Sequence, residues 1–198
     1  MSFELVQGVS AENFDKVHSA YSVEENGISA IVSAEQMFPL IIDLIKQLDE
    51  PVFFFIELPC KEEEELKLRK SKTDPMHYNL YYLDNCTLPV AEAIMKRYGQ
   101  LLINDGLCRF GFGAHNSGEE IYCLKYQMIS VFGDAKKFSK CFGKHKIPCE
   151  QGFITLWDTF SDETPGVSSS VEINGETVYD IVGNLKSEGI YHADIVEE

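Results

Sequence analysis

The chain has 198 residues, with 32 acidic against 17 basic side chains, so its formal net charge is −15. The 44% hydrophobic content suits a packed core, no apolar run reaches the roughly 18 residues that span a bilayer, and the first residues lack the pattern of a secretory signal. An acidic surface repels phosphate backbones and anionic membranes. We therefore expect a cytoplasmic globular protein that binds neither nucleic acid nor membrane.

The first strong element is a predicted helix over residues 33–48, after a short strand over residues 27–33. Ser33 and Gln36 have the spacing of a capping box. The apolar positions of the helix recur at intervals of three and four residues: Met37, Leu40, Ile41, Leu44, Ile45 and Leu48. Residues 52–58 then form a nearly continuous apolar run, which is typical of a central strand buried on both faces.

The middle of the chain alternates between helical and strand patterns. Four acids pass into a basic cluster over residues 61–70, which indicates a solvated helix or a loop. Residues 77–84 resume strand character, and Thr87 precedes a second helix that ends near residue 104. Residues 107–113 and 120–132 predict two strands joined as an antiparallel hairpin.

The last third of the chain has weaker signals. Residues 133–142 predict a short basic helix, and residues 153–160 predict a strand that places Trp157 in the core. An Asn-Gly pair within residues 171–178 is a strong hairpin signal, and residues 179–187 predict a final helix.

Capped helices between strands, together with hairpins, predict an α+β fold. No segment has the composition of a linker, so we expect one domain over residues 1–198. Its sheet is mixed or antiparallel, and two main helices pack on it.

Six cysteines occur without any pair at the two-residue spacing of a redox or zinc-knuckle motif. A chain of this length can build its own core, so we expect reduced thiols and no cofactor. Cys141, His145 and Cys149 are spaced by four residues, and thiolates and imidazoles bind zinc. An alternative zinc site there needs a fourth ligand, and the competing interpretation is a basic segment with two packed thiols.

A second group of candidate residues surrounds the end of the predicted hairpin: Arg109, His115, Glu119 and Glu120. Imidazole exchanges protons near neutral pH, so His115 could act as a general base oriented by Glu119 or Glu120. The glycines within residues 111–113 precede a turn and a strand, whereas a phosphate cradle has glycines that open a helix. The competing interpretation is a glycine-bearing strand packed beneath another element.

Asp158, Asp162 and Glu163 form a third group, whose oxygens could bind a divalent cation. They lack the alternation and the central glycine of a calcium loop. The competing interpretation is a turn that Pro165 and Gly166 complete.

Charge is unevenly distributed along the chain. Residues 1–66 hold 14 acids and 3 bases, residues 67–150 hold 8 and 13, and residues 151–198 hold 10 and 1. Acidic ends favour solubility or a basic protein partner whose approach they steer. The acids that we expect to be exposed and to contact such a partner are Glu62, Glu63, Glu64, Glu65, Asp162 and Glu163.

The chain resembles small bacterial immunity proteins, which are encoded beside polymorphic or contact-dependent toxins. The resemblance lies in the acidic ends, the stretch Asp105-Gly106-Leu107-Cys108-Arg109-Phe110-Gly111-Phe112-Gly113 and the stretch Trp157-Asp158-Thr159-Phe160. The resemblance implies a cytoplasmic, non-catalytic protein that binds and blocks a cognate toxin, often a basic nuclease. The basic middle segment departs from a uniformly acidic inhibitor. The alternative is a small hydrolase or metal-dependent enzyme with a site near His115 and Glu119, and the oligomeric state is left open.

Overall fold

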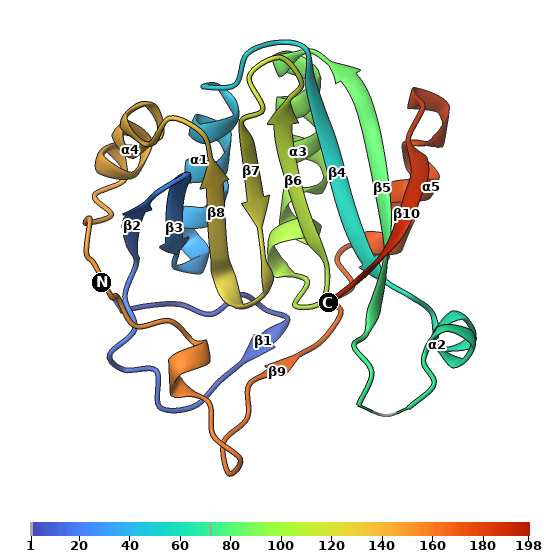
Figure 1. Cartoon of the computed structure of the whole chain (residues 1–198), viewed down its shortest axis with the longest axis horizontal. Helices are drawn as coiled ribbons and strands as arrows, with labels where there is room; N and C mark the ends of the chain where they lie inside the picture. The colour runs from blue at the N-terminus through green and yellow to red at the C-terminus, as the bar shows by residue number, and fades with distance from the viewer. Residues whose placement is uncertain (1, 72) are drawn as a thin grey trace.

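An eight-stranded antiparallel sheet forms the body of the computed structural model, which describes residues 2–71 and 73–198 (Figure 1). Its strands lie in the order β10-β5-β4-β6-β7-β8-β3-β2. In chain order they are β2 (Ala20–Glu24), β3 (Gly27–Ile31), β4 (Val52–Pro59), β5 (His77–Cys86), β6 (Arg109–Ala114), β7 (Glu120–Cys123), β8 (Met128–Phe132) and β10 (Tyr191–Glu197). A separate antiparallel pair joins β1 (Val9–Ser10) to β9 (Val167–Ser168).

Two long helices, α1 (Ala34–Ile45) and α3 (Leu88–Asn104), pack against each other behind the sheet in Figure 1. The shorter helices are α2 (Glu62–Leu68), α4 (Ala135–Lys144) and α5 (Val178–Asn184), and the 3-10 turns are η1 (Lys125–Gln127), η2 (Trp157–Thr159) and η3 (Lys186–Glu188). The predicted α+β fold with two main helices is therefore confirmed, and the sheet is antiparallel. None of the helices in the described part of the chain is long and apolar enough to cross a bilayer.

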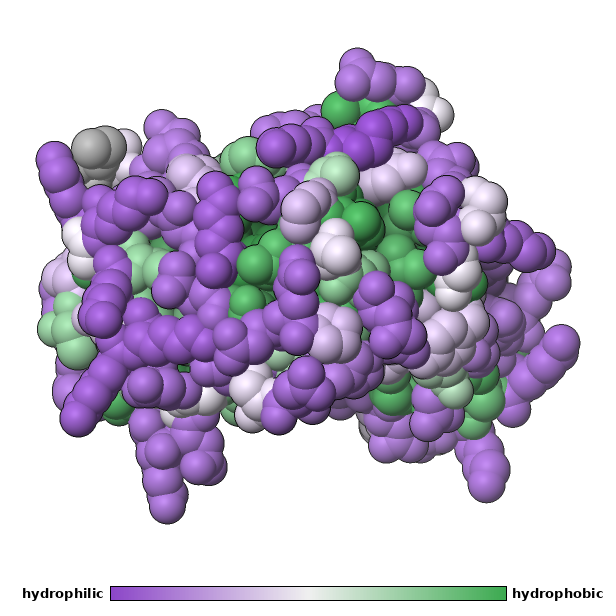
Figure 2. Space-filling model, turned by 90° about the horizontal axis from the view of Figure 1, so that it is seen from above, coloured by the Kyte–Doolittle hydropathy of each residue, from purple (hydrophilic) through white to green (hydrophobic). Residues whose placement is uncertain are grey.

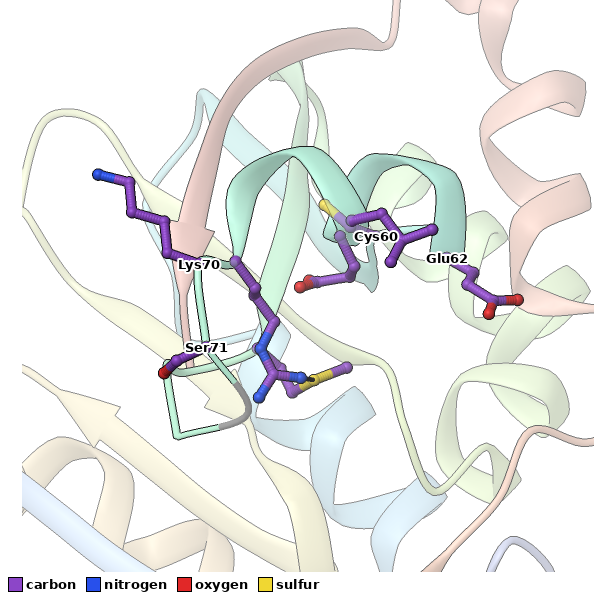
Figure 3. A pocket seen from close by; sticks show the side chains of 8 residues that line it. Cys60, Glu62, Lys70 and Ser71 are labelled. Atoms are coloured by element: carbon purple, nitrogen blue, oxygen red, sulfur yellow. Dashed lines mark hydrogen bonds between the residues drawn. The ribbon is translucent and has the colours of Figure 1, made fainter.

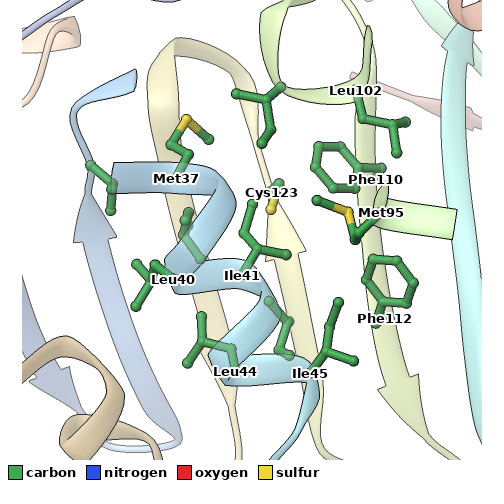
Figure 4. Close-up of a cluster of buried hydrophobic side chains, with 14 of the residues drawn as sticks. Met37, Leu40, Ile41, Leu44, Ile45, Met95, Leu102, Phe110, Phe112 and Cys123 are labelled. Atoms are coloured by element: carbon green, nitrogen blue, oxygen red, sulfur yellow. The ribbon is translucent and has the colours of Figure 1, made fainter. Parts of the chain in front are cut away.

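The core lies between the sheet and these two helices (Figure 4). The predicted stripe of α1 points into it, and Leu40, Ile41 and Leu44 are fully buried. They meet side chains from α3 and from strands β6 and β7, among them Phe110 and Phe112. Each fully buried aliphatic side chain contributes about 1.5–3 kcal/mol to stability. In the view from above, most of the surface is hydrophilic and the hydrophobic residues gather near its middle (Figure 2).

Strand β4 occupies the predicted central position, between β5 and β6. Successive side chains of a strand point to opposite faces. Phe54 and Ile56 belong to the core beneath the helices, so Phe53, Phe55 and Glu57 point to the other face. This alternation explains why the whole run is apolar, since both faces of β4 carry packed rings.

Two predicted strands differ from the structure. Residues 120–132 form two strands, because η1 reverses the chain between them with Tyr126 at a φ of 55° and Gln127 at 61°. Residues 153–160 form no strand, and the prediction that Trp157 is a core residue is wrong, since 52% of it is exposed. Its ring instead meets Tyr126 at 4.4 Å between centroids.

Three further local details depart from the patterns. The Ser33 hydroxyl accepts from the Glu4 backbone N–H at 2.9 Å and makes no capping bond, so the predicted capping box is wrong. The Asn174-Gly175 turn closes a single bridge rather than a pair of strands. Strand β10, which no pattern predicted, forms one edge of the sheet against β5.

Candidate functional site

The sheet face opposite α1 and α3 carries a continuous patch of rings, which we name the aromatic face. It consists of Phe53, Phe55, Tyr82, His115, Tyr122 and Tyr191. Neighbouring ring centroids lie 4.8–6.4 Å apart. No described helix lies in front of this face in Figure 1. Tyr191, at 47% exposed, and His115 belong to the molecular surface, Phe53, Tyr82 and Tyr122 are half-buried, and Phe55 is buried beneath them.

Two glycines of β6 create the room that these rings occupy. In the strand register, Gly113 faces Phe53 and Gly111 faces Phe55. A Cβ atom on Gly113 would lie 2.2 Å from Phe53 Cζ, and one on Gly111 would lie 2.4 Å from Phe55 Cε1. A glycine in a strand marks such a close approach. The glycines of β6 thus leave room for two phenylalanine rings of the neighbouring strand β4, and no other helix or strand of the described chain is shown packing over them.

Arg109 and Glu57 form a buried ion pair at the lower end of the aromatic face. Arg109 Nε lies 2.5 Å from Glu57 Oε2, a close charge contact rather than an aligned hydrogen bond. The Tyr122 hydroxyl donates to the same oxygen at 2.8 Å. The Arg109 guanidinium also lies over the Tyr78 ring, 4.2 Å from its centroid. Arg109 is therefore engaged within the fold and lies at the end of β6 opposite to His115.

Glu120 lies on the same face, between Gly113 of β6 and Phe132 of β8. Burial, and then the nearby charge of Glu57, raise the pKa of Glu120. Among residues 2–71 and 73–198 its carboxylate has no hydrogen-bond or ion-pair partner. The aromatic face thus contains a half-buried acid that no cation of the described chain neutralises.

His115 contacts Asp84, which lies outside the group of candidate residues around the hairpin end. Its Nε2 lies 3.1 Å from Asp84 Oδ1, and the Tyr191 hydroxyl donates to Asp84 Oδ2 at 2.7 Å. Glu119 instead accepts from Lys137 Nζ of α4 at 2.7 Å and is buried. The predicted group of four residues is therefore not brought together, although His115 and Glu120 both lie on the aromatic face.

Helix α2 presents the predicted acidic run, with one exception. Glu62, Glu63 and Glu64 are exposed. Glu65 is buried, since its carboxylate accepts from the His77 backbone N–H at 2.6 Å and lies 3.3 Å from His77 Nδ1. The expectation of an exposed Glu65 is therefore wrong, because this side chain ties α2 to the start of β5.

A cavity of about 550 Å³ lies between α2 and the loop that leads to β5 (Figure 3). Leu66 and Met76 supply exposed apolar lining, and Glu62 and Lys70 carry opposite charges at its edge. Burial, and then the charges of the α2 glutamates, raise the pKa of Cys60 to about 11. The thiol at the base of the cavity is therefore protonated at neutral pH.

Asp162 and Glu163 are exposed, as expected, on the loop that follows η2. Asp158 is not directed toward them, because its carboxylate accepts from the Thr155 backbone N–H at 2.8 Å and from the Thr155 hydroxyl at 2.7 Å. This loop and α2 lie on different sides of the lower end of the molecule in Figure 1. The two predicted acidic contacts thus belong to separate surfaces.

The alternative zinc ligands have other partners. His145 Nε2 lies 2.7 Å from Asp43 Oδ2, and the Cys141 thiol donates to the Asp43 backbone oxygen at 3.5 Å. Cys149 is exposed beyond the end of α4. Over the described part of the chain, no group of three His, Cys, Asp or Glu side chains is placed to hold a metal ion.

A comparison with protein-family models, with curated proteins and with solved structures finds no match to this chain. What the protein binds is therefore inferred from the chemistry of its surface. The aromatic face brings together rings and charges from several strands, because β4, β5, β6, β7 and β10 all contribute to it or to its edge.

Proposed function

We propose that this protein binds a basic protein partner through the aromatic face. The observation that supports the proposal is a continuous patch of phenylalanine and tyrosine rings on a sheet face that no described helix covers. When one face of an antiparallel sheet packs on the core, the other face ordinarily carries polar side chains. Tyrosine and other large rings are instead enriched at protein interfaces. The net charge of −15 favours a partner of opposite sign.

Within this class of binding proteins, we propose an immunity protein that blocks a cognate bacterial toxin in the cytoplasm. The resemblance in the sequence and the acidic charge support this assignment. The mechanism is steric occlusion, in which the aromatic face covers a basic functional surface of the toxin. Exposed acids such as Glu62 and Asp162 increase the rate of encounter by long-range attraction.

The test is an affinity isolation from source-cell lysate at low and at high salt, followed by mass spectrometry. Three proteins are compared: the wild type, the double variant Tyr191→Ala/His115→Ala in the aromatic face, and Trp157→Ala, whose exposed ring lies elsewhere. We expect the wild type and Trp157→Ala to retain one stoichiometric basic protein at low salt. High salt should release this protein, and the double variant should fail to retain it. Co-expression of the wild type should then protect cells from that protein.

Two results would contradict the proposal. One is the absence of any stoichiometric partner at both salt concentrations. The other is a partner that the double variant holds as tightly as the wild type does, because such a partner uses another surface.

A hydrolase is the second candidate function, and the contact of His115 with Asp84 is the observation that favours it. A carboxylate that holds an imidazole is a common arrangement for a general base. Replacement of His115 by Gln should then abolish turnover while the melting temperature stays nearly constant. A lowered melting temperature with unchanged turnover would assign His115 a structural role.

A further inference from the structure

We propose that Glu120 and the rings beside it form a subsite for one arginine side chain of the basic partner. The guanidinium would pair with the Glu120 carboxylate and stack against the neighbouring phenylalanine rings. The inference rests on the proposed function for the source of the arginine, whereas the chemistry of the subsite is argued from the aromatic face itself.

A buried site at the lower end of the aromatic face already holds one guanidinium by this combination of groups. Arg109 pairs with the carboxylate of Glu57 and lies over the Tyr78 ring at 4.2 Å. A carboxylate neutralises the cation, and a ring face attracts it through its quadrupole. On this side of the sheet the fold therefore already pairs a guanidinium with a carboxylate and a ring, although this pair is buried.

Glu120 has the same kinds of neighbours without a cation. It faces Gly113 across the β6–β7 pair, and the Phe53 ring covers Gly113. On its other side it faces Phe132, which is 46% exposed. The carboxylate thus lies between two phenylalanine side chains, at a position open to a side chain that arrives from outside.

The local charge also favours a cation at this position. Burial, and then the charges of Glu120, Glu57 and Asp84, raise the pKa of Tyr82 in the middle of the aromatic face. Arg109 neutralises Glu57 alone. Glu120 is half-buried, and in such an environment an ionised carboxylate without a partner is costly. A bound cation would remove that cost.

Arginine fits this subsite better than lysine. A guanidinium is planar and weakly hydrated, so it can pair with a carboxylate while it stacks on a ring. An ammonium is compact and strongly hydrated and loses more on entering a half-buried aromatic site. The partner residue is therefore expected to be an arginine near the centre of the contact, where such residues dominate binding energy.

The experiment uses Nα-acetyl-arginine-N-methylamide as the probe and the citrulline analogue as its uncharged isostere. Titration into the full-length labelled protein is followed by NMR, because a single side chain binds weakly. We expect amide shifts centred on Gly113, Glu120 and Phe132 for the arginine probe. Glu120→Gln should weaken its binding at least about fivefold. Glu63→Gln, which removes an exposed acid on α2, should leave it unchanged.

Three results would overturn the subsite: equal binding of the citrulline analogue, equal binding to Glu120→Gln, or shifts that map to another surface. A purified protein whose aromatic face is buried in a homodimer, as sedimentation and the same NMR spectra would reveal, would overturn it as well. Binding of the probe without any basic partner in the lysate would sustain the subsite and contradict the proposed function. A partner that Glu120→Gln binds as tightly as the wild type does would contradict the subsite and leave the proposed function supported.

Discussion

The Phe53 ring lies directly over Gly113, so closely that a Cβ atom on this glycine would be 2.2 Å from Phe53 Cζ. Gly113→Ala therefore forces the ring to move and disturbs the centre of the aromatic face. We expect a loss of about 1–3 kcal/mol in the free energy of unfolding, the usual cost of overpacking. Urea denaturation measures this loss, and affinity for a partner should fall with it.

Gly143→Ala is the matched control for that substitution. Gly143 lies within α4, and apart from its chain neighbours and the backbone of its own helix no described heavy atom lies within 4 Å of the position that a Cβ atom would take there. Alanine is the better helix former, so stability should rise by roughly 0.5–1 kcal/mol. Equal effects of the two substitutions would contradict the close packing of Phe53 on Gly113.

Removal of either charge of the Arg109–Glu57 pair should lower the free energy of unfolding substantially. Their side chains are 13% and 10% exposed. Arg109→Gln leaves Glu57 buried without its cation, which should cost about 3–5 kcal/mol in urea denaturation. The double variant Arg109→Gln/Glu57→Gln should recover a large part of this loss, because neither charge remains.

The exposed pair of Arg97 with Glu176 provides the comparison. Its Nη2–Oε2 distance is 2.7 Å, but the arginine side chain is 55% exposed. Arg97→Gln should therefore lower stability by no more than about 1 kcal/mol. A loss as large as that of Arg109→Gln would show that burial does not decide the difference.

Stability should depend on pH through Glu120. Burial, and then the charge of Glu57, hold the pKa of this carboxyl above its ordinary value of 4.5. The folded state therefore binds the proton more tightly than the unfolded chain, so ionised Glu120 lowers stability at neutral pH. This penalty is lost as pH falls through the folded-state pKa. Glu120→Gln should exceed the wild type in stability at neutral pH and match it in strong acid, and a pH-independent difference would refute the assignment.

Thiol chemistry should single out Cys149. It is exposed, whereas the other five cysteines are buried. Burial raises the pKa of Cys60 to about 11, so the reactive thiolate is scarce even beside the cavity. A chromogenic disulfide reagent should titrate one thiol promptly and the others only after unfolding. Cys149→Ser should remove the prompt phase, and a second prompt thiol in the wild type would contradict the burial of the rest.

Charge reversal on α2 should slow association with a basic partner. The triple variant Glu62→Lys/Glu63→Lys/Glu64→Lys should lower the association rate by about tenfold at low salt and flatten its salt dependence. Stopped-flow measurements over a range of ionic strength test this expectation. Glu65 is left intact because it binds His77. An association rate that changes neither with salt concentration nor in the triple variant would exclude electrostatic steering.

Local patterns predicted the elements that bury a regular stripe. The helical period of α1 and the apolar run of β4 could be recognised because each pattern lies within a short stretch of consecutive residues. The break between β7 and β8 had no such signal, because Tyr126 and Gln127 adopt positive φ values that neither residue type favours. The core position predicted for Trp157 is wrong because a large ring can also pack against other rings at the protein surface.

The site was predicted only in part, for a reason that lies in strand geometry. Glu119 and Glu120 are adjacent in sequence, so both were expected near His115. One of them meets Lys137 of α4 and the other lies on the aromatic face. The partner of His115, Asp84, comes from another strand 31 positions away. A signal was present in the Gly-x-Gly of β6 and the Phe-x-Phe of β4, whose period of two places glycines under rings when the strands pair.

The pairing of β3 with β8 has a consequence for synthesis on the ribosome. The β2–β3 hairpin is made early, but its sheet neighbour begins at Met128. At roughly 5–20 residues per second, the hairpin waits about 5–20 s before β8 is translated. During that time Ile28 and Ile31, which are buried in the folded protein, should lack the cover that β8 provides. Nascent chains of this protein should therefore engage chaperones through their first 50 or so residues until the far half of the sheet emerges.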